Sequence, residues 1–142
     1  MRTKNLLVAF FILIWAGCED DPKYEIYENH DITVCGIKDP IRNIDWVAEI
    51  CNRKEFALYE SIRVYKNKET EEIYLRYSYQ FFVGVSRESW TKIYTCSGEV
   101  IMEGSRIGPS GPPYDFWRDF ESQNELIGTI WTVEKIKIQQ PE

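Results

Sequence analysis

Residue type alternates regularly between Ile73 and Val83, and this alternation constrains the fold more than any other feature of the sequence. Every second side chain from Ile73 is aliphatic or aromatic, while the side chains between them are mainly polar. Because neighbouring side chains of a strand point to opposite faces, a period of two predicts a half-buried antiparallel strand. The predicted inward face carries Ile73, Leu75, Tyr77, Tyr79, Phe81 and Val83.

Further strand patterns lie on both sides of this segment. Residues 61–66 alternate in the same way, and residues 90–96 and 99–104 flank a Ser97-Gly98 turn that is typical of a hairpin. Residues 125–138 form the last strand pattern. Together these segments predict an antiparallel meander of about five strands.

An amphipathic helix is predicted before the strands. Ile44, Val47 and Cys51 recur at helical spacing. Asp39 is suited to cap this helix, and Pro40 suits its first position. Three to four turns are expected to lie on the sheet. The predicted fold class is therefore α+β, an N-terminal amphipathic helix packed on the meander, in a single domain over residues 32–142.

The N-terminus carries the pattern of an exported lipoprotein. Arg2 and Lys4 precede an apolar run, 6–16, which is shorter than the roughly 20 residues of a membrane-spanning helix. Ala16-Gly17-Cys18 then resembles a bacterial lipobox, although Trp15 stands where that pattern usually has an aliphatic residue. We expect a signal peptide over 1–17, lipid attachment at Cys18 and an acidic tether over 18–31. The alternatives are an ordinary signal peptide or a buried N-terminal strand.

Three acidic residues directly after Cys18 bear on the location. Glu19, Asp20 and Asp21 are similar to the export signal that carries Bacteroidota-type lipoproteins to the outer face of the outer membrane. The expected location is the outer membrane and its cell surface, with membrane contact through the lipid anchor. Orientation toward the periplasm stays open.

Composition excludes other classes of protein. Hydrophobic residues make up 44% of the chain and aromatic residues 15%, which excludes a disordered chain. Acidic residues number 23 against 17 Lys and Arg, whereas nucleic-acid binding needs clustered basic residues. We therefore expect no nucleic-acid partner.

Two segments resemble a known family. The segment "CGIKDPIRNIDWVAEI", at 35–50, is similar to a C-G-[VI]-x-x-P-[LI]-x-x-[LI]-x-W-[LV] motif of small Bacteroidota-type surface lipoproteins of unknown function. "YTCSGEVI", at 94–101, is similar to their Y-x-C-x-G-x-V-I hairpin, and "YDF" and "LIGTIW" stand at their late motifs. The resemblance implies a lipoprotein with one domain and brings no catalytic residues. Some members carry further cysteines, where this chain has Met102 and Pro113.

Three cysteines remain if Cys18 carries lipid. Cys35, Cys51 and Cys96 can form at most one disulfide. Cys51 falls on the apolar face of the predicted helix, where cysteine is commonly a small core residue. We therefore favour a Cys35–Cys96 bridge, although spacing alone leaves the other pairings open.

Catalytic and metal-binding patterns are weak. His30 is the only histidine and lies in the predicted tether, where no rigid frame would position it as a base. The isolated cysteines do not match a structural zinc site, and the sequence has no phosphate or calcium loop motif. Glu60 shares strand parity with apolar residues, which indicates either a carboxylate facing the core or an ion pair with an arginine at the sheet margin. We expect no enzyme, cofactor or metal; a hydrolase using two carboxylates is the least favoured function.

Binding is the favoured function, and two surfaces are candidates. Aromatic rings beside hydrogen-bonding groups on the outer face of two strands suit a sugar or a protein partner, although such pairs also stabilise an exposed sheet. A proline-rich loop is the second candidate. We expect a surface lipoprotein that binds a protein or glycan non-covalently; the alternative is a structural or accessory subunit of an envelope complex. The predicted binding face comprises Tyr59, Arg63, Tyr65, Tyr74, Arg76, Ser78 and Gln80, and the loop comprises Pro109, Ser110, Pro112 and Pro113.

Overall fold

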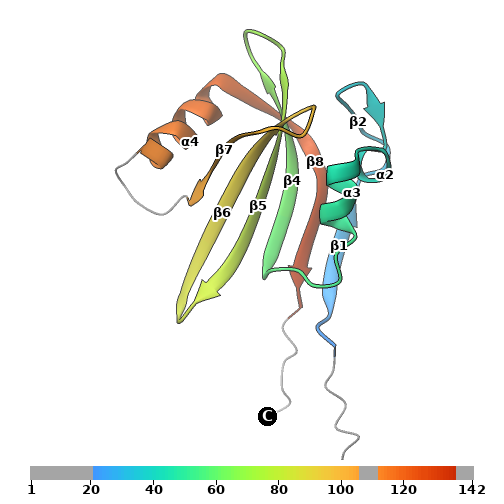
Figure 1. Cartoon of the computed structure of the whole chain (residues 1–142), viewed down its shortest axis with the longest axis vertical. Coiled ribbons are helices and arrows are strands. Elements are labelled where there is room, and N and C mark those ends of the chain that lie inside the picture. Colours follow the sequence, from blue (N-terminus) through green and yellow to red (C-terminus); the bar gives the residue numbers. More distant parts are fainter. Residues whose placement is uncertain (1–20, 106–111, 137–142) are drawn as a thin grey trace, which may run out of the picture.

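The chain folds around one six-stranded antiparallel sheet with the strand order β1-β8-β4-β5-β6-β7 (Figure 1). A computed structural model describes residues 21–105 and 112–136. A separate two-stranded ribbon pairs β2 with β3. The strands are β1 (Tyr24–Glu28), β2 (Thr33–Val34), β3 (Ile37–Lys38), β4 (Tyr59–Asn67), β5 (Ile73–Val83), β6 (Ser86–Thr95), β7 (Val100–Ser105) and β8 (Asn124–Lys135), and the helices are α2 (Pro40–Asn43), α3 (Asp45–Cys51) and α4 (Pro112–Gln123).

The strongest sequence prediction is confirmed in β5. This strand spans Ile73–Val83, and Leu75 is fully buried on the face that the alternation predicts to point inward. Strands β4 to β7 follow one another as an antiparallel meander, as predicted.

The predicted α+β class is wrong, because the described protein is mostly β and has no long N-terminal helix. The expected helix is split at Ile44, whose backbone is extended (φ −110°, ψ 110°), so that α2 has four residues and α3 has seven. Asp39 adopts a left-handed conformation (φ 50°) and makes no side-chain cap. The apolar spacing was informative nonetheless, since Ile44, Val47 and Cys51 are all buried.

The sheet also exceeds the predicted five strands and is more than a meander. Strand β8 does not extend the meander past β7 but lies between β1 and β4. Strand β1, at Tyr24–Glu28, lies within the predicted tether and pairs with β8, Tyr24 opposite Lys135 and Glu28 opposite Trp131. The sequence did not predict this strand, because two of its residues are acidic. A short edge strand needs little apolar sequence.

Each face of the main sheet carries its own apolar cluster. The α3 face, defined by Ile62, Leu75 and Trp131, is covered by α2 and α3, and all three residues are fully buried. The α4 face, defined by Tyr65, Arg76 and Ile93, is covered in part by Trp117 and Phe120 of α4. Figure 1 shows the helices on opposite sides of the sheet. The chain is thus a sheet between two partial helical layers.

A disulfide and a stacked ring pair join the N-terminal segment to the β6–β7 turn. Cys35, in the β2–β3 turn, is bonded to Cys96, which is the pairing that the sequence favoured. The Trp46 ring stacks on Tyr94 with 4.2 Å between ring centroids. A β-carbon added to Gly98 would lie 2.8 Å from Cδ1 of Trp46. The indole is therefore held between Tyr94 and a turn that has room only for glycine.

We predict that Gly98→Ala destabilises the protein more than Gly84→Ala does. Both glycines have positive φ, +87° and +61°, so each substitution costs about 1–2 kcal/mol of backbone strain. Only the Gly98 substitution also meets a side chain, because nothing lies within 4 Å at Gly84. Urea unfolding of both variants, repeated in a Trp46→Ala background, measures the difference. The extra loss at Gly98 should disappear in the Trp46→Ala background, and equal losses for the two glycines while Trp46 is present would contradict the packing described here.

Candidate functional site

The predicted binding face is a real set of cross-strand neighbours. Tyr59 lies opposite Gln80, Arg63 opposite Arg76, and Tyr65 opposite Tyr74 in the β4–β5 register. These residues therefore share the α4 face of the sheet, as strand parity requires.

Helix α4 covers one half of this predicted face. Tyr65 and Arg76 are buried, and the Arg76 guanidinium lies 5.0 Å from the Tyr65 ring centroid. Arg76 Nη1 is also 3.0 Å from Oε1 of Glu121 on α4, and Tyr74 packs on Phe120. Tyr65, Tyr74 and Arg76 thus hold the helix on the sheet and cannot receive a ligand while it is in place.

The other half of the predicted face is less buried than the half under α4. Tyr59, Arg63, Ser78 and Gln80 remain half-buried. Within residues 21–105 and 112–136, the Arg63 side chain makes no hydrogen bond or ion pair. A half-buried guanidinium without a partner leaves its donors free for an acceptor from outside the chain.

A groove of about 1230 Å³ lies where this half meets the end of the sheet. We call it the basal groove. Glu25, Glu134, Tyr59 and Gln80 form one continuous cross-strand row on its floor, from β1 to β5. The next row on the α4 face carries the hydroxyls of Thr132, Ser61 and Ser78. The groove is lined by Pro22, Lys23, Glu25, Leu58, Tyr59, Gln80, Phe82, Arg87, Glu134, Lys135 and Ile136.

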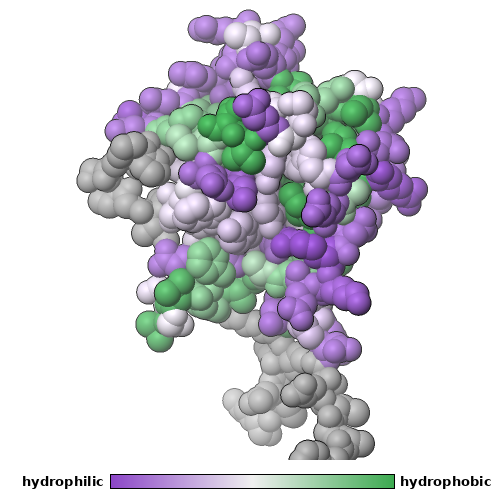
Figure 2. All heavy atoms as spheres, in the orientation of Figure 1, coloured by the Kyte–Doolittle hydropathy of each residue, from purple (hydrophilic) through white to green (hydrophobic). Residues whose placement is uncertain are grey.

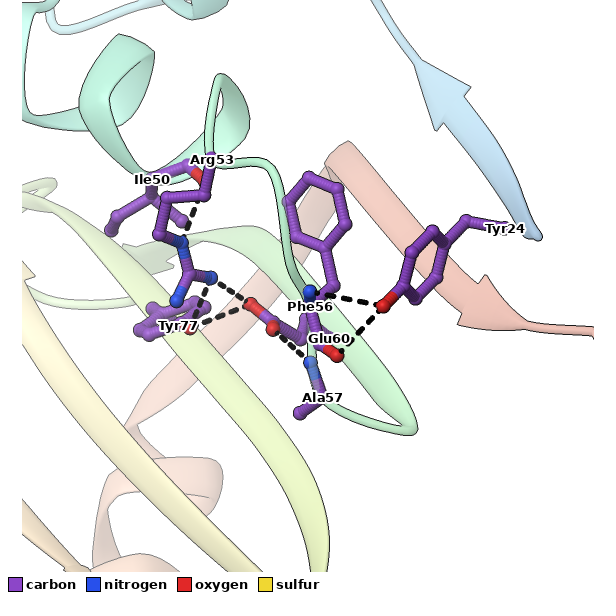
Figure 3. Close-up of polar contacts among 7 residues, drawn as sticks. All are labelled: Tyr24, Ile50, Arg53, Phe56, Ala57, Glu60 and Tyr77. Atoms are coloured by element: carbon purple, nitrogen blue, oxygen red, sulfur yellow. Dashed lines mark hydrogen bonds and ion pairs between the residues drawn. The ribbon is translucent and has the colours of Figure 1, made fainter. Parts of the chain in front are cut away.

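A buried carboxylate occupies the α3 face at the same end of the sheet (Figure 3). Glu60 is 1% exposed, and Figure 3 shows it between the Arg53 side chain and the 56–57 backbone. Its Oε1 accepts from the Ala57 amide at 2.6 Å, and its Oε2 accepts from the Tyr77 hydroxyl at 2.6 Å and from Arg53. Burial and the bond to Glu60 raise the pKa of Tyr77, so its hydroxyl stays protonated and donating.

The Glu60 cluster fits a structural role better than a catalytic one. Three donors already use the carboxylate, and they tie the loop from α3 to β4 onto the sheet. A pocket of about 410 Å³ beside it is lined by Arg53, Ala57, Glu60, Tyr77, Tyr79, Phe81 and Lys92. Glu60 is the one carboxylate among these described lining residues, whereas glycoside hydrolysis uses two. The sequence offered two hypotheses for Glu60, a carboxylate facing the core or an ion pair with an arginine. Glu60 has both features, because it is buried and is paired with Arg53.

His30 is part of a fixed contact rather than a mobile segment. Its Nδ1 lies 2.8 Å from Oδ1 of Asp39, and its Nε2 lies 2.9 Å from Oε2 of Glu28. These two hydrogen bonds raise the pKa of His30 above its ordinary value. The two contacts bridge β1 to the start of α2. Among the described residues, no group of three ligand-type side chains is arranged to hold a metal ion.

Several other predicted residues can be placed only in part. Cys18, Pro109 and Ser110 lie outside the described residues, while Pro112 and Pro113 begin the backbone of α4. Cys51 is a free thiol in the core, where burial raises its pKa to about 12. No helix among the described residues is long and apolar enough to cross a bilayer.

Comparison with known proteins leaves the site to be interpreted from its own geometry. No family model matches the chain. No curated protein and no solved structure matches it either.

We predict that the His30 contact makes stability depend on pH near neutrality. The pKa of His30 is higher in the folded protein than its unfolded value of about 6.5. The contact therefore stabilises the protein fully below about pH 6.5, and this stabilisation is lost as the pH rises through the pKa of the folded state. The difference in unfolding free energy between the wild type and His30→Gln should therefore shrink from pH 5.5 toward pH 8 on chemical denaturation, at about constant ionic strength. His30 is the only histidine, so no other such side chain titrates in this window. A difference that stays constant with pH would show that the contact contributes nothing.

Proposed function

We propose that this protein is a lipid-anchored lipoprotein of the outer membrane that binds an extracellular glycan non-covalently in the basal groove. The observation that carries the proposal is the half-buried strip of the α4 face formed by Tyr59, Arg63, Ser78 and Gln80. That strip combines a groove at the end of the sheet with the guanidinium of Arg63, which has no hydrogen-bond or ion-pair partner among the described residues.

The lining of the groove favours a sugar. Tyr59 offers a ring face and Gln80 offers an amide with both donors and an acceptor. In the next row, Ser78 adds a hydroxyl, whose Oγ lies 2.9 Å from Oγ1 of Thr91. Sugar rings combine apolar C–H faces with hydroxyl groups that donate and accept, so such a mixed surface matches them. Charges of both signs line the groove, from Lys135 and Arg87 to Glu25 and Glu134. This balance does not select a strongly charged ligand.

Binding without reaction is supported by the same geometry. The carboxylates that line the groove, Glu25 and Glu134, are both exposed and lie on adjacent strands. The buried carboxylate, Glu60, lies on the opposite face with its oxygens already bonded. Among its described lining residues, the groove therefore has no buried carboxylate.

Removal of the Tyr59 ring is expected to weaken glycan binding about tenfold, since the loss of one aromatic contact of about 1.4 kcal/mol corresponds to that factor. The detergent-solubilised protein would first be screened on a glycan array, and the best ligand would then be titrated against Tyr59→Ala and Gln80→Ala by calorimetry. Tyr27→Ala is the matched control, because Tyr27 is an exposed tyrosine of the α4 face that does not line the groove.

The outcome of that screen also tests the rival functions. An unchanged affinity in Tyr59→Ala would place the ligand elsewhere. The accessory-subunit function would replace glycan binding if no glycan on the array binds and a second protein co-purifies stoichiometrically with the anchored form.

Lipid attachment has a separate test. We expect Cys18→Ser to move the protein from the membrane fraction to the soluble fraction, because several acyl chains supply most of the membrane affinity of a lipoprotein. Metabolic labelling with a fatty-acid analogue gives the second measurement and should label the wild type only. Labelling of the serine variant would refute attachment at Cys18.

A further inference from the structure

We propose that the tip of the β5–β6 hairpin inserts into the lipid surface beside the anchor and so fixes how the basal groove faces the membrane. We define this hairpin tip as Phe82, Val83, Gly84 and Val85. The inference rests on the proposed lipid attachment at Cys18. It concerns a second, non-covalent membrane contact.

The hairpin tip exposes apolar side chains that the fold cannot bury. Phe82 is 52% exposed, Val83 is 59% exposed and Val85 is fully exposed. Phe82 belongs to the α4 face and Val83 to the α3 face, so they point to opposite sides of the ribbon. No single packing surface of the protein could cover both, and Figure 2 shows an apolar patch at the lower left, where the hairpin of Figure 1 ends.

Strand register places the hairpin tip at the end of the sheet from which the N-terminal segment leaves. Tyr24 pairs with Lys135, Glu134 with Tyr59, and Tyr59 with Gln80, so these residues mark one end of the sheet. The β5–β6 ribbon continues past Gln80 for three more register pairs, to Val83 opposite Ser86, or about 10 Å. The hairpin tip therefore projects beyond the body of the sheet on the side of the anchor.

The chain between the anchor and the sheet is too short to hold the domain far from the bilayer. Tyr24 already begins β1, so only the five residues 19–23, or six Cα–Cα steps, separate Cys18 from a fixed point of the fold. Fully extended, that segment spans at most about 20 Å. A projecting apolar hairpin at the same end then lies within reach of the lipid, which argues for a bilayer rather than a second copy or another protein as its occupant.

The groups around the hairpin tip set the depth of insertion. The Arg87 guanidinium lies 5.9 Å from the Phe82 ring centroid, and Lys23 and Lys135 lie at the same end of the sheet. These cations would stay among the headgroups while the apolar side chains enter the interface. The turn backbone has no strand partner beyond Val83 and Ser86, so deeper burial in hydrocarbon would leave its polar groups unsatisfied. Insertion is thus interfacial.

The test places an environment-sensitive fluorophore at each end of the lipidated, full-length protein. Val85→Cys carries the label at the hairpin tip, and Glu69→Cys carries it in the exposed β4–β5 turn at the opposite end. The free native thiol, Cys51, is buried and does not compete for the label. The proteins are reconstituted into phosphatidylethanolamine–phosphatidylglycerol vesicles with lipids brominated near the headgroup.

The expected result is a blue-shifted emission at position 85 that brominated lipid quenches several-fold more strongly than at position 69. Equal quenching at both positions would overturn the inference, and so would a blue shift at 85 that depends on protein density and not on brominated lipid. Vesicle flotation of the wild type beside Cys18→Ser separates the two proposals. If both proteins fail to float, the anchor itself is wrong; if the wild type alone floats and position 85 stays unquenched, only the hairpin contact is wrong.

Discussion

The fold depends on the pairing of its last strand, β8, with two strands that are distant in the sequence, β1 and β4. Strand β8 lies between β1 and β4, so both halves of the sheet meet on it, and it brings the fully buried Trp131 and Val133 to the α3 face. Phe56, in the loop before β4, packs on Trp131 as well. Without β8, the edge strand β1 has no partner and β4 has an open edge. Such non-local pairing carries a large loop-closure cost, so the sheet is completed only when the whole chain is present.

Helix α4 decides which part of the sheet is accessible. Strand alternation in 73–83 predicted correctly which residues share a face, because side-chain direction follows from backbone geometry alone. It could not predict that Phe120 and Trp117 cover Tyr65, since that contact is set by the path of the chain between β7 and β8. The less buried half of the face was within the prediction, but Phe82 and Arg87 were missed. They line the groove because the β5–β6 hairpin extends past the end of the sheet, and residue alternation does not predict the length of a hairpin.

Local sequence signals failed at the N-terminal side for physical reasons. The spacing of Ile44, Val47 and Cys51 identified buried positions correctly. The same spacing is compatible with one long helix and with two short helices separated by an extended Ile44, so it could not distinguish them. The disulfide could be favoured by elimination, because Cys51 is a core residue. Strand β1 was not predicted because its sequence is rich in acidic residues. It is ordered because it pairs with the otherwise open edge of β8.

The position of β1 also has a mechanical consequence. The segment that would carry the anchor enters the sheet at Tyr24, and β1 pairs with β8 alone among the described strands. A pull on the anchor along the strand axis loads the ladder from Tyr24–Lys135 to Glu28–Trp131 in shear, so its hydrogen bonds share the force instead of breaking one by one. The bridge from Glu28 through His30 to Asp39 lies just behind this ladder. Drag on a captured ligand would thus be resisted by the edge strand first, and the two cores would yield only after it had slipped.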